Sequence, residues 1–513
     1  MFSIRPHRTN DHPHPAGPLG LAEEAAGDKA ESALRSRVLR PIRSFRPAYL
    51  PLVMVYFAAG ALGIVEVSRD LWIKERLTWT AAELAGIGVW LTLPWTMKMV
   101  VGALVDSVPI FGSQRRSYVL IGAALIASGM LTLAGAAGRW LTLARADDLY
   151  VAGALLIVVG TVVQSVVAEA MSAEVVARLD AAGNARPEHE VRAELGMVQV
   201  IGRLSVAVGI LAVAGLSGWL ASVFDRQTVF LLGLIIPAIS VAGVLLVRLP
   251  AAERRPLDWR IFGGGMGFSA VILALAFLSV PFEQEMIFAL TLAVICAMLT
   301  VLTRELDAKT RRAIVFTSVI IFVFRAMPTA GSSYFWWTLD VLKFDAAFYG
   351  TLRQTSAIVS VAALWLFSRQ LTEYSVTKVL FWIAIAGAVL SLPSVALFYG
   401  LGGWTLATFG FGARPIVLVH EAVVAPFAEF SMIPLLTLIA FYAPPGRRAT
   451  WFALMASLMN TALIAAQLQT KYLNQVFVIS RGNYAELGWL LIATVAIGLV
   501  VPLVALALFG RRI

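Results

Sequence analysis

The sequence predicts an all-α membrane protein that crosses the bilayer many times, with two six-helix halves and a central pair of extra helices. Three observations support this fold class. Of the 513 residues, 59% are hydrophobic and 14% are charged, whereas soluble domains carry about 25% charged residues. The apolar residues form runs of about 20, the length of a membrane-spanning helix, and not the alternating segments of about 10 that build a barrel. The basic residues lie mainly in short loops between these runs.

Fourteen apolar segments follow one another along the chain. Each is long enough to cross about 30 Å of hydrocarbon as a helix. Six precede the basic linker near the middle of the chain, two lie in that linker and six follow it. We expect membrane-spanning helices at residues 48–67, 84–105, 116–138, 149–171, 196–219, 228–248, 261–280, 286–303, 313–337, 347–367, 378–399, 415–441, 449–470 and 487–509.

The loops between the segments alternate in charge. Basic residues such as Arg511 and Arg512 fall on one side of the membrane, and acidic residues such as Asp147 fall on the other. Because basic loops stay in the cytoplasm, we expect both termini there and the chain in the cell (inner) membrane. If the segments 261–280 and 286–303 are left out, every other segment keeps its orientation in the membrane, as expected of an inserted pair of helices. The net charge of +10 therefore reflects topology, and no nucleic-acid partner is expected.

The chain divides into four parts. We expect a disordered cytoplasmic tail at 1–47, a six-helix bundle at 48–250, a linker with two extra helices at 251–312 and a second six-helix bundle at 313–513. The tail has no apolar run and is rich in Pro, Ala and Arg. Its histidines could bind a metal, but no rigid site surrounds them, so a solvated tail and no bound metal are expected: His7, His12 and His14.

A turn between the second and third segments has the chemistry of a gate. Gly102 and Asp106 end the second segment, and Arg115 and Arg116 begin the third. Glycine permits close helix approach, Asp106 can accept hydrogen bonds from a neighbouring helix N-terminus, and the arginines can pair with acids. Such contacts can form in one access state and break in the other. The pattern resembles the loop between helices 2 and 3 of the major facilitator superfamily; a plain basic turn is the alternative.

A longer motif is more specific. Leu93-Pro94-Trp95-x-x-Lys98 is followed by Asp-Ser-Val-Pro-Ile-Phe-Gly from Asp106 and by Arg-Arg-Ser-Tyr up to Tyr118. This spacing resembles the folate-biopterin transporter family, as do Phe324-x-x-x-Pro328 and the Pro-Pro-Gly stretch at 444–446 with the residues that follow it up to Asn460. The resemblance covers roughly residues 50–510 and implies a transporter of folates or pterins with the major facilitator fold.

Two positions depart from the family pattern. The family often has two acids, Asp-x-x-x-Asp, in the fourth helix, whereas this chain has Ser165-x-x-x-Glu169. The family's Glu after Pro-Gly is Arg448 here. Both changes bear on cargo and coupling, so the resemblance defines the fold and transport class more firmly than the solute.

Several charges lie inside apolar runs, where they are costly unless they face a cavity or a partner. Lys98, Arg203 and Arg325 are expected to form an electropositive cavity for an anionic solute, because an Arg fork binds carboxylate at two points. Trp95, beside Lys98, is a candidate stacking residue. Candidate carriers of a coupling proton are the carboxylates Glu66, Glu169 and Glu429.

Two alternatives for these charges stay open. The first is internal ion pairing that only satisfies buried charge, for example between Glu169 and Arg203. The second is that Glu66 lies merely at the membrane interface, near Arg69 and Asp70. The aromatic run from Tyr334 to Trp337 has two interpretations as well. It forms a belt at the membrane interface or a wall that stacks on a flat ring of the solute.

The motifs of common enzymes are not found. The chain has no phosphate-binding Gly-rich loop ending in Lys-Ser/Thr, no Gly-x-Ser-x-Gly and no His-Glu-x-x-His, so neither enzyme activity nor a cofactor is expected. The single Cys296 excludes an internal disulfide. We expect a proton-driven, monomeric transporter of a small solute in the lipid bilayer. The alternatives are another cargo on the same fold (a sugar, a muropeptide or a drug) and a transport-inactive assembly factor.

Overall fold

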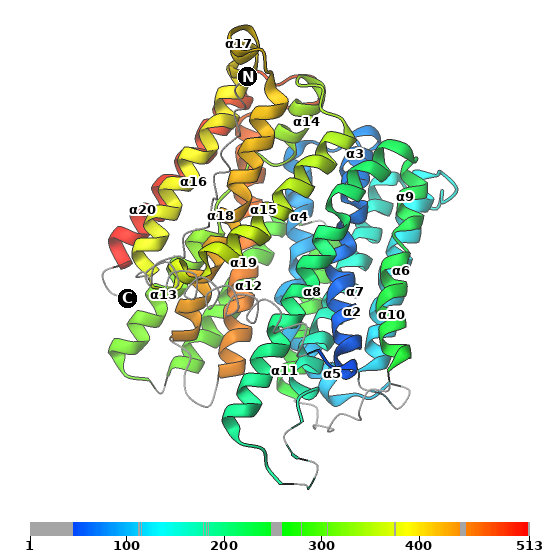
Figure 1. Cartoon of the computed structure of the whole chain (residues 1–513), viewed down its shortest axis with the longest axis vertical. Coiled ribbons are helices and arrows are strands. Elements are labelled where there is room, and N and C mark those ends of the chain that lie inside the picture. The colour runs from blue at the N-terminus through cyan, green and yellow to red at the C-terminus, as the bar shows by residue number, and fades with distance from the viewer. Residues whose placement is uncertain are drawn as a thin grey trace, which may run out of the picture.

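The computed structural model describes residues 45–510, apart from residues 111, 112, 114, 178, 181, 183, 248–258, 279, 305, 374, 375 and 442–447. Within this part of the chain every element is a helix, and β pairing is limited to isolated bridges in turns. The prediction of an all-helical chain is confirmed (Figure 1). The expected tail lies outside the described residues as far as residue 44.

The helices of the first half lie between residues 45 and 247. They are η1 (Pro47–Tyr49), α2 (Leu50–Ala61), η2 (Leu62–Val65), α3 (Glu66–Arg76), α4 (Ala81–Thr96), α5 (Lys98–Ser107), α6 (Arg116–Ala137), α7 (Ala146–Glu174), α8 (Glu188–Val223), α9 (Arg226–Leu232) and α10 (Ile235–Leu246).

A central pair of helices, α11 (Trp259–Leu278) and α12 (Glu283–Thr303), precedes the second half at residues 308–510. The helices of the second half are α13 (Ala308–Arg325), α14 (Ser332–Asp340), α15 (Ala346–Glu373), α16 (Val376–Phe398), α17 (Leu401–Phe409), α18 (Ala413–Phe441), α19 (Arg448–Val476) and α20 (Leu487–Phe509).

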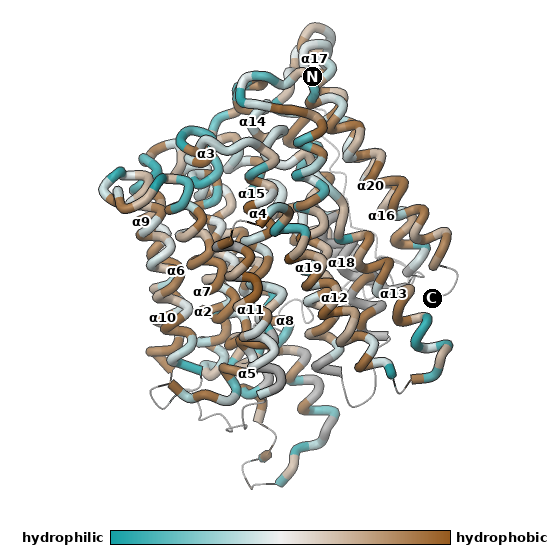
Figure 2. The backbone as a smooth tube through the Cα atoms, turned by 180° about the vertical axis from the view of Figure 1, so that it is seen from behind, coloured by the Kyte–Doolittle hydropathy of each residue, from teal (hydrophilic) through white to brown (hydrophobic). Residues whose placement is uncertain are grey.

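Helices occupy the position of each predicted apolar segment. By length and composition, nine helices of the described chain could cross a membrane, and up to eleven could if each of two bent pairs is one span. The expected total of fourteen crossings therefore stays a prediction. Figure 2 shows apolar residues along the outer helices α10, α16 and α20, whose large side chains remain exposed, among them Leu246, Val389 and Val500. Such exposed apolar faces suit contact with lipid.

Several expected helices are broken, and the breaks position charged residues. The second segment bends by 40° between α4 and α5, where Pro94 removes a backbone donor near the end of α4. The first segment changes to a 3-10 turn at Leu62–Val65, and Glu66 begins the next helix. The segment predicted as continuous at 313–337 is interrupted between α13 and α14. Pro328 lies in that interruption, and Gly331 has φ +62°, a conformation that favours glycine.

The core of the first half depends on close helix approach. A Cβ added at Gly60 in α2 would lie 2.2 Å from the carbonyl oxygen of Val206 in α8. One added at Gly209 in α8 would lie 2.3 Å from the carbonyl oxygen of Phe57. Only glycine lets the two backbones come this close, so α2 and α8 form a tightly packed pair.

The two ends of the molecule differ in how the halves meet. We call the end with α3, α9 and α14, which is uppermost in Figure 1, the α3–α14 end. The opposite end, with α5 and the start of α11, is the α5–α11 end. The halves meet mainly through two helix pairs, α8 with α15 and α4 with α19.

Candidate substrate site between the halves

Polar contacts join the halves at the α3–α14 end. Lys74 of α3 forms an ion pair with Asp340, the last residue of α14. The guanidinium of Arg481 donates hydrogen bonds to the carbonyl oxygens of Ile73 and Trp79, at 3.2 and 3.3 Å. It also lies 4.9 Å from the ring centroid of Trp336. This end is therefore held by an ion pair, hydrogen bonds and a cation–π contact.

The ion pair at this end persists at neutral pH. Burial raises the pKa of Asp340, but hydrogen bonds from Lys74 and Tyr484 outweigh it and leave the pKa below its usual range. Burial and the hydrogen bond to Asp340 raise the pKa of Tyr484 to about 12. A carboxyl with a depressed pKa stabilises the fold above its unfolded pKa, and this contribution is lost only as the pH falls through the lower folded pKa. The contact is thus insensitive to pH between about 5 and 8.

A second ion cluster between the halves lies at the start of α3 and involves α15. Arg353 of α15 forms an ion pair with Glu66 of α3 and lies 3.8 Å from a carboxylate oxygen of Asp70. Arg69 binds Asp70 through Nε and Nη2, at 3.1 and 3.0 Å. About a third of each of these four side chains is exposed, from 31% to 38%. We call this group the Glu66–Arg353 cluster.

The break between α4 and α5 carries a third group of charges. Lys98 forms an ion pair with Glu169 of α7 at 2.5 Å, and its Nζ lies 5.5 Å from the ring centroid of Trp95. The Glu169 side chain is 57% exposed, and the hydroxyl of Ser165 donates to it at 3.4 Å. The structure thus brings together three residues predicted for the substrate site and for proton coupling. We call them, with Ser165, the Lys98–Glu169 cluster.

Arg203 lies near this cluster. Tyr56 of α2 is within electrostatic reach of both Glu169 and Arg203, and its ring contacts α8 at Gly202, where a Cβ would lie 2.7 Å from it. Arg203 is exposed, and within the described chain it forms no ion pair. Glu169 pairs with Lys98 and not with Arg203, so the expected internal pairing involves a different base.

The same break touches the second half. The side-chain amide of Asn460 in α19 donates to the carbonyl oxygen of Trp95 at 3.2 Å, and the hydroxyl of Ser457 donates to that of Thr96 at 3.4 Å. The Lys98–Glu169 cluster therefore lies beside the α4–α19 contact. None of its printed contacts involves the residues that join the halves at the α3–α14 end.

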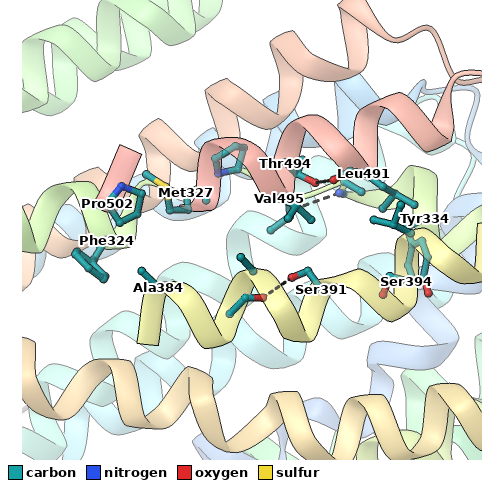
Figure 3. A pocket seen from close by; sticks show the side chains of 18 of the residues that line it. Phe324, Met327, Tyr334, Ala384, Ser391, Ser394, Leu491, Thr494, Val495 and Pro502 are labelled. Carbon is teal, nitrogen blue, oxygen red and sulfur yellow. Dashed lines mark hydrogen bonds between the residues drawn. The ribbon is translucent and has the colours of Figure 1, made fainter. Parts of the chain in front are cut away.

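Two other predicted site residues, Arg325 and Glu429, belong to the second half of the chain. Arg325 is the last residue of α13 and is partly buried. Glu429 lies within α18, but its side chain is outside the described part. Phe324, beside Arg325, lines a cavity of about 490 Å³ within the second half, between the α13–α14 break, α16 and α20. Figure 3 shows Tyr334, Ser391 and Thr494 among the residues around this cavity.

The predicted gate residues form a network inside the first half. Arg115 donates to Asp106 at 2.8 Å, to the Val105 carbonyl oxygen at 3.2 Å, and through Nε to Glu174 at 3.0 Å. Burial lowers the pKa of Arg115, but the hydrogen bonds to Glu174 and Asp106 raise it above its usual value. The network ties α5, α6 and α7 together within the first half.

Two other gate candidates have a plainer setting. Arg116 is exposed, and its backbone N–H donates to the hydroxyl of Ser113 at 3.1 Å. A Cβ at Gly102 would lie 3.9 Å from Val166, which is an ordinary contact. Gly102 makes no close helix approach in this packing, and its part in gating stays a prediction.

The two indoles of the aromatic run in α14 are buried, whereas Tyr334 of the same run lines a cavity. Trp336 and Trp337 are 1% and 4% exposed and lie in the core around Ala81, Leu487 and Leu490. Buried indoles form neither an interfacial belt nor an open stacking wall. Tyr334 alone of the run lines the 490 Å³ cavity.

Several charged residues of these ion contacts were not among the candidates from the sequence. Arg353 lies inside the predicted apolar segment 347–367, so the rule that selected Lys98 also selects it. Asp70 and Glu174 give no such signal, because each lies at or beyond the end of a predicted segment. No group of three or more metal-binding side chains occurs in the described part of the chain.

Comparison with known proteins identifies the family. Residues 59–513 match the model of the BT1 family. The chain is 25% identical over 419 residues to the folate-biopterin transporter of Synechocystis sp., covering 80% of this chain and 72% of that protein. It is 24% identical over 481 residues to the probable folate-biopterin transporter 4 of Arabidopsis thaliana, covering 87% of this chain and 92% of that protein.

Solved structures support the fold. A POT family transporter in complex with 5-aminolevulinic acid superimposes with a TM-score of 0.64 at 15% identity, covering 91% of this chain and 96% of that one. A second, in complex with a thioalcohol-conjugated peptide, has a TM-score of 0.62 at 15% identity, covering 92% and 99%. At this identity the likeness concerns the fold alone. The chain belongs to the BT1 family and is an integral membrane transporter, not an enzyme.

Proposed function

We propose that this protein is a secondary transporter that moves a small, planar, anionic solute of the folate or pterin class by alternating access, driven by protons. Two relatives named as folate-biopterin transporters support the solute class. The observation that carries the mechanism is the Lys98–Glu169 cluster. An exposed ion pair, an indole and the nearby Arg203 lie next to the contact between the halves.

The ion pair gives a way to couple a proton to the solute. In this mechanism Glu169 takes a proton, which neutralises the carboxylate and releases Lys98. The carboxylate of the solute then binds Lys98 and Arg203, and its flat ring stacks on Trp95. Glu66 is a second coupling candidate, since its protonation weakens the pair with Arg353 that joins the halves. Glu429 stays a candidate on sequence grounds.

The contacts between the halves support one access state. Lys74–Asp340, the Arg481 hydrogen bonds and the Glu66–Arg353 cluster all close the α3–α14 end. Glu169 and Arg203 stay exposed, and the Lys98 side chain is 22% exposed. The charge of the loops predicts that the opposite α5–α11 end is cytoplasmic, which supports assigning this conformation to an inward-facing state. Release of Asp106 or Glu174 from Arg115 is then a candidate event in the change of access.

Substituting the two arginines tests the electropositive site. We expect Arg203→Ala and Arg325→Ala each to reduce uptake of radiolabelled folate into proteoliposomes by about 10-fold or more, because an Arg–carboxylate contact contributes about 1.5–3 kcal/mol. Insertion, measured by the size-exclusion profile, should stay normal. Arg414→Ala is a matched control. Arg414 lies at the start of α18, is half exposed and forms an ion pair with Asp345. Normal uptake by both variants would exclude the electropositive cavity.

A different cargo on the same fold is the second candidate. Ser165 and Arg448 depart from the family pattern at two positions, which favours a changed specificity. Thermal stabilisation across a panel of folates, pterins, sugars, muropeptides and drugs separates the two candidates, because a ligand stabilises only the state that it binds. Stabilisation by folates or pterins alone supports the first candidate, and stabilisation by another class supports the second.

A further inference from the structure

The central helix pair encloses a cavity of its own. Helix α11 packs on α5, where a Cβ at Gly265 would lie 2.2 Å from the side chain of Val100. Helix α12 packs instead on α19, with Ile295 and Leu299 in the same core cluster as Leu454. The two helices therefore pack against different helices, and a cavity of about 450 Å³ remains between them and the α4–α5 break.

The lining of this cavity is apolar. It includes Met97, Val100, Phe268, Ile295 and Met298, and the backbone of two glycines of α11. Its three hydroxyls already donate to backbone carbonyl oxygens: Thr96 to Leu93, Thr291 to Ile287 and Ser457 to Thr96. A polar solute needs a few well-placed polar groups, which this lining does not offer. An apolar cavity of about 150 Å³ already stays dry and takes up an apolar ligand, and this one is three times larger.

The cavity opens toward the outside of the helix bundle. Val294, which is 42% exposed, and the exposed Gly264 belong to its lining. In an integral membrane protein this surface meets lipid chains. The cavity is therefore accessible to an acyl chain directly from the bilayer.

Exposed cations lie at the same end of α12. Arg304 follows Met298 by six residues, which is about 9 Å along a helix. Three more basic residues begin the next helix, and all four are exposed: Arg304, Lys309, Arg311 and Arg312. Juxtamembrane cations attract anionic head groups. The charge of this region selects an anionic lipid over a zwitterionic one.

We propose that this cavity is a binding site for one acyl chain of an anionic phospholipid, whose head group lies against the four basic residues at the α12–α13 turn. The lipid comes from the leaflet at the α5–α11 end. Its chain packs against Met97 and Val100, on the side of the α4–α5 break that faces α11 and α12. The lipid thus supports the break that positions Lys98 and Trp95. This site goes beyond the transport function and does not depend on the identity of the solute.

The test uses the full-length chain in vesicles of phosphatidylethanolamine and phosphatidylglycerol with a phosphatidylglycerol probe that carries a diazirine on one acyl chain. After irradiation, mass spectrometry should find adducts in the peptides that contain residues 96–100 and 291–298. Gly264→Leu should reduce these adducts about tenfold, because its side chain enters open space at the cavity. Gly267→Leu is the matched control, since it also meets open space but does not line the cavity. It should leave the adducts unchanged.

Other outcomes overturn the proposal. Labelling that Gly264→Leu leaves unchanged, or that spreads evenly over all outer helices, excludes the site. If Gly264→Leu does not assemble, Val294→Trp fills the cavity from α12 and is held to the same expectation. Equal labelling by a phosphatidylcholine probe with the same diazirine excludes the head-group part. Arg304→Ala/Lys309→Ala/Arg311→Ala/Arg312→Ala should lower phosphatidylglycerol labelling to the phosphatidylcholine level, and failure to do so also excludes that part.

Discussion

Replacing Gly218 by leucine will abolish uptake by holding the two halves apart at the α3–α14 end. A Cβ at Gly218 in α8 would lie 2.4 Å from the backbone nitrogen and Cα of Gly350 and from the carbonyl oxygen of Ala346 in α15. These are backbone atoms, so the helices must separate to make room. A transporter that cannot close at one end cannot complete an alternating-access cycle. Uptake into proteoliposomes should fall to background while each half keeps its own packing.

A labelling measurement separates this effect from misfolding. Val67 is 2% exposed and packs with Leu339 and Tyr349 between the halves. In a Cys296→Ser background, a cysteine at Val67 should react about tenfold faster with a maleimide when Gly218→Leu is present, since about 1.4 kcal/mol changes a two-state ratio tenfold. Gly403→Leu is the control, because a side chain there meets open space. Unchanged reactivity together with normal uptake would contradict the close approach of α8 and α15.

Arg353→Ala should reduce uptake roughly 5- to 30-fold, the effect of about 1–2 kcal/mol. It removes the partner of Glu66 and leaves that carboxylate facing α15 without a cation from the second half. The loss is smaller than for a fully buried pair, because both side chains are about one third exposed. The state closed at the α3–α14 end then becomes less populated, and the rate of the cycle falls.

A charge swap tests whether the pair itself matters. Glu66→Arg/Arg353→Glu restores an opposite-charge pair across the halves, so it should transport better than either single variant. Nonadditivity of this kind is the signature of direct coupling. Arg226→Ala is a suitable control, since Arg226 pairs with Glu75 within the first half. A double variant no more active than the single variants would show that the pair does not join the halves.

The helical architecture was predictable because it depends on local sequence. Runs of apolar residues must form helices in a bilayer, where every backbone group needs an internal partner. The helices break beside Pro94 and Pro328, whereas α16 continues through Pro393. The 3-10 turn at Leu62–Val65 was not predicted, although Gly60 precedes it and Gly63 lies in it. Its conformation depends on packing against α8, which the local sequence does not show.

The site was predictable only in part. Lys98 and Glu169 were found because charges are costly within apolar runs. Their pairing with each other required the positions of α5 and α7 in space. The contact between Glu66 and Arg353 joins residues far apart in the chain and from different halves, and no local pattern encodes it. The indoles of Trp336 and Trp337 are the converse case. The sequence predicts a functional role for them, but their burial in the core is enough to explain them.

Uptake of radiolabelled folate and pterins into proteoliposomes, with and without a pH gradient, shows whether this protein is a proton-driven transporter of these solutes. We predict saturable uptake that is faster when a proton gradient points in the direction of solute movement. In the Glu169→Gln variant, uptake should no longer respond to the gradient. Asp340→Asn should leave the pH dependence between pH 5 and 8 unchanged, because the pKa of Asp340 lies below its usual range. Saturable uptake of another solute class, or folate uptake indifferent to the gradient in the unmodified protein, would contradict the account.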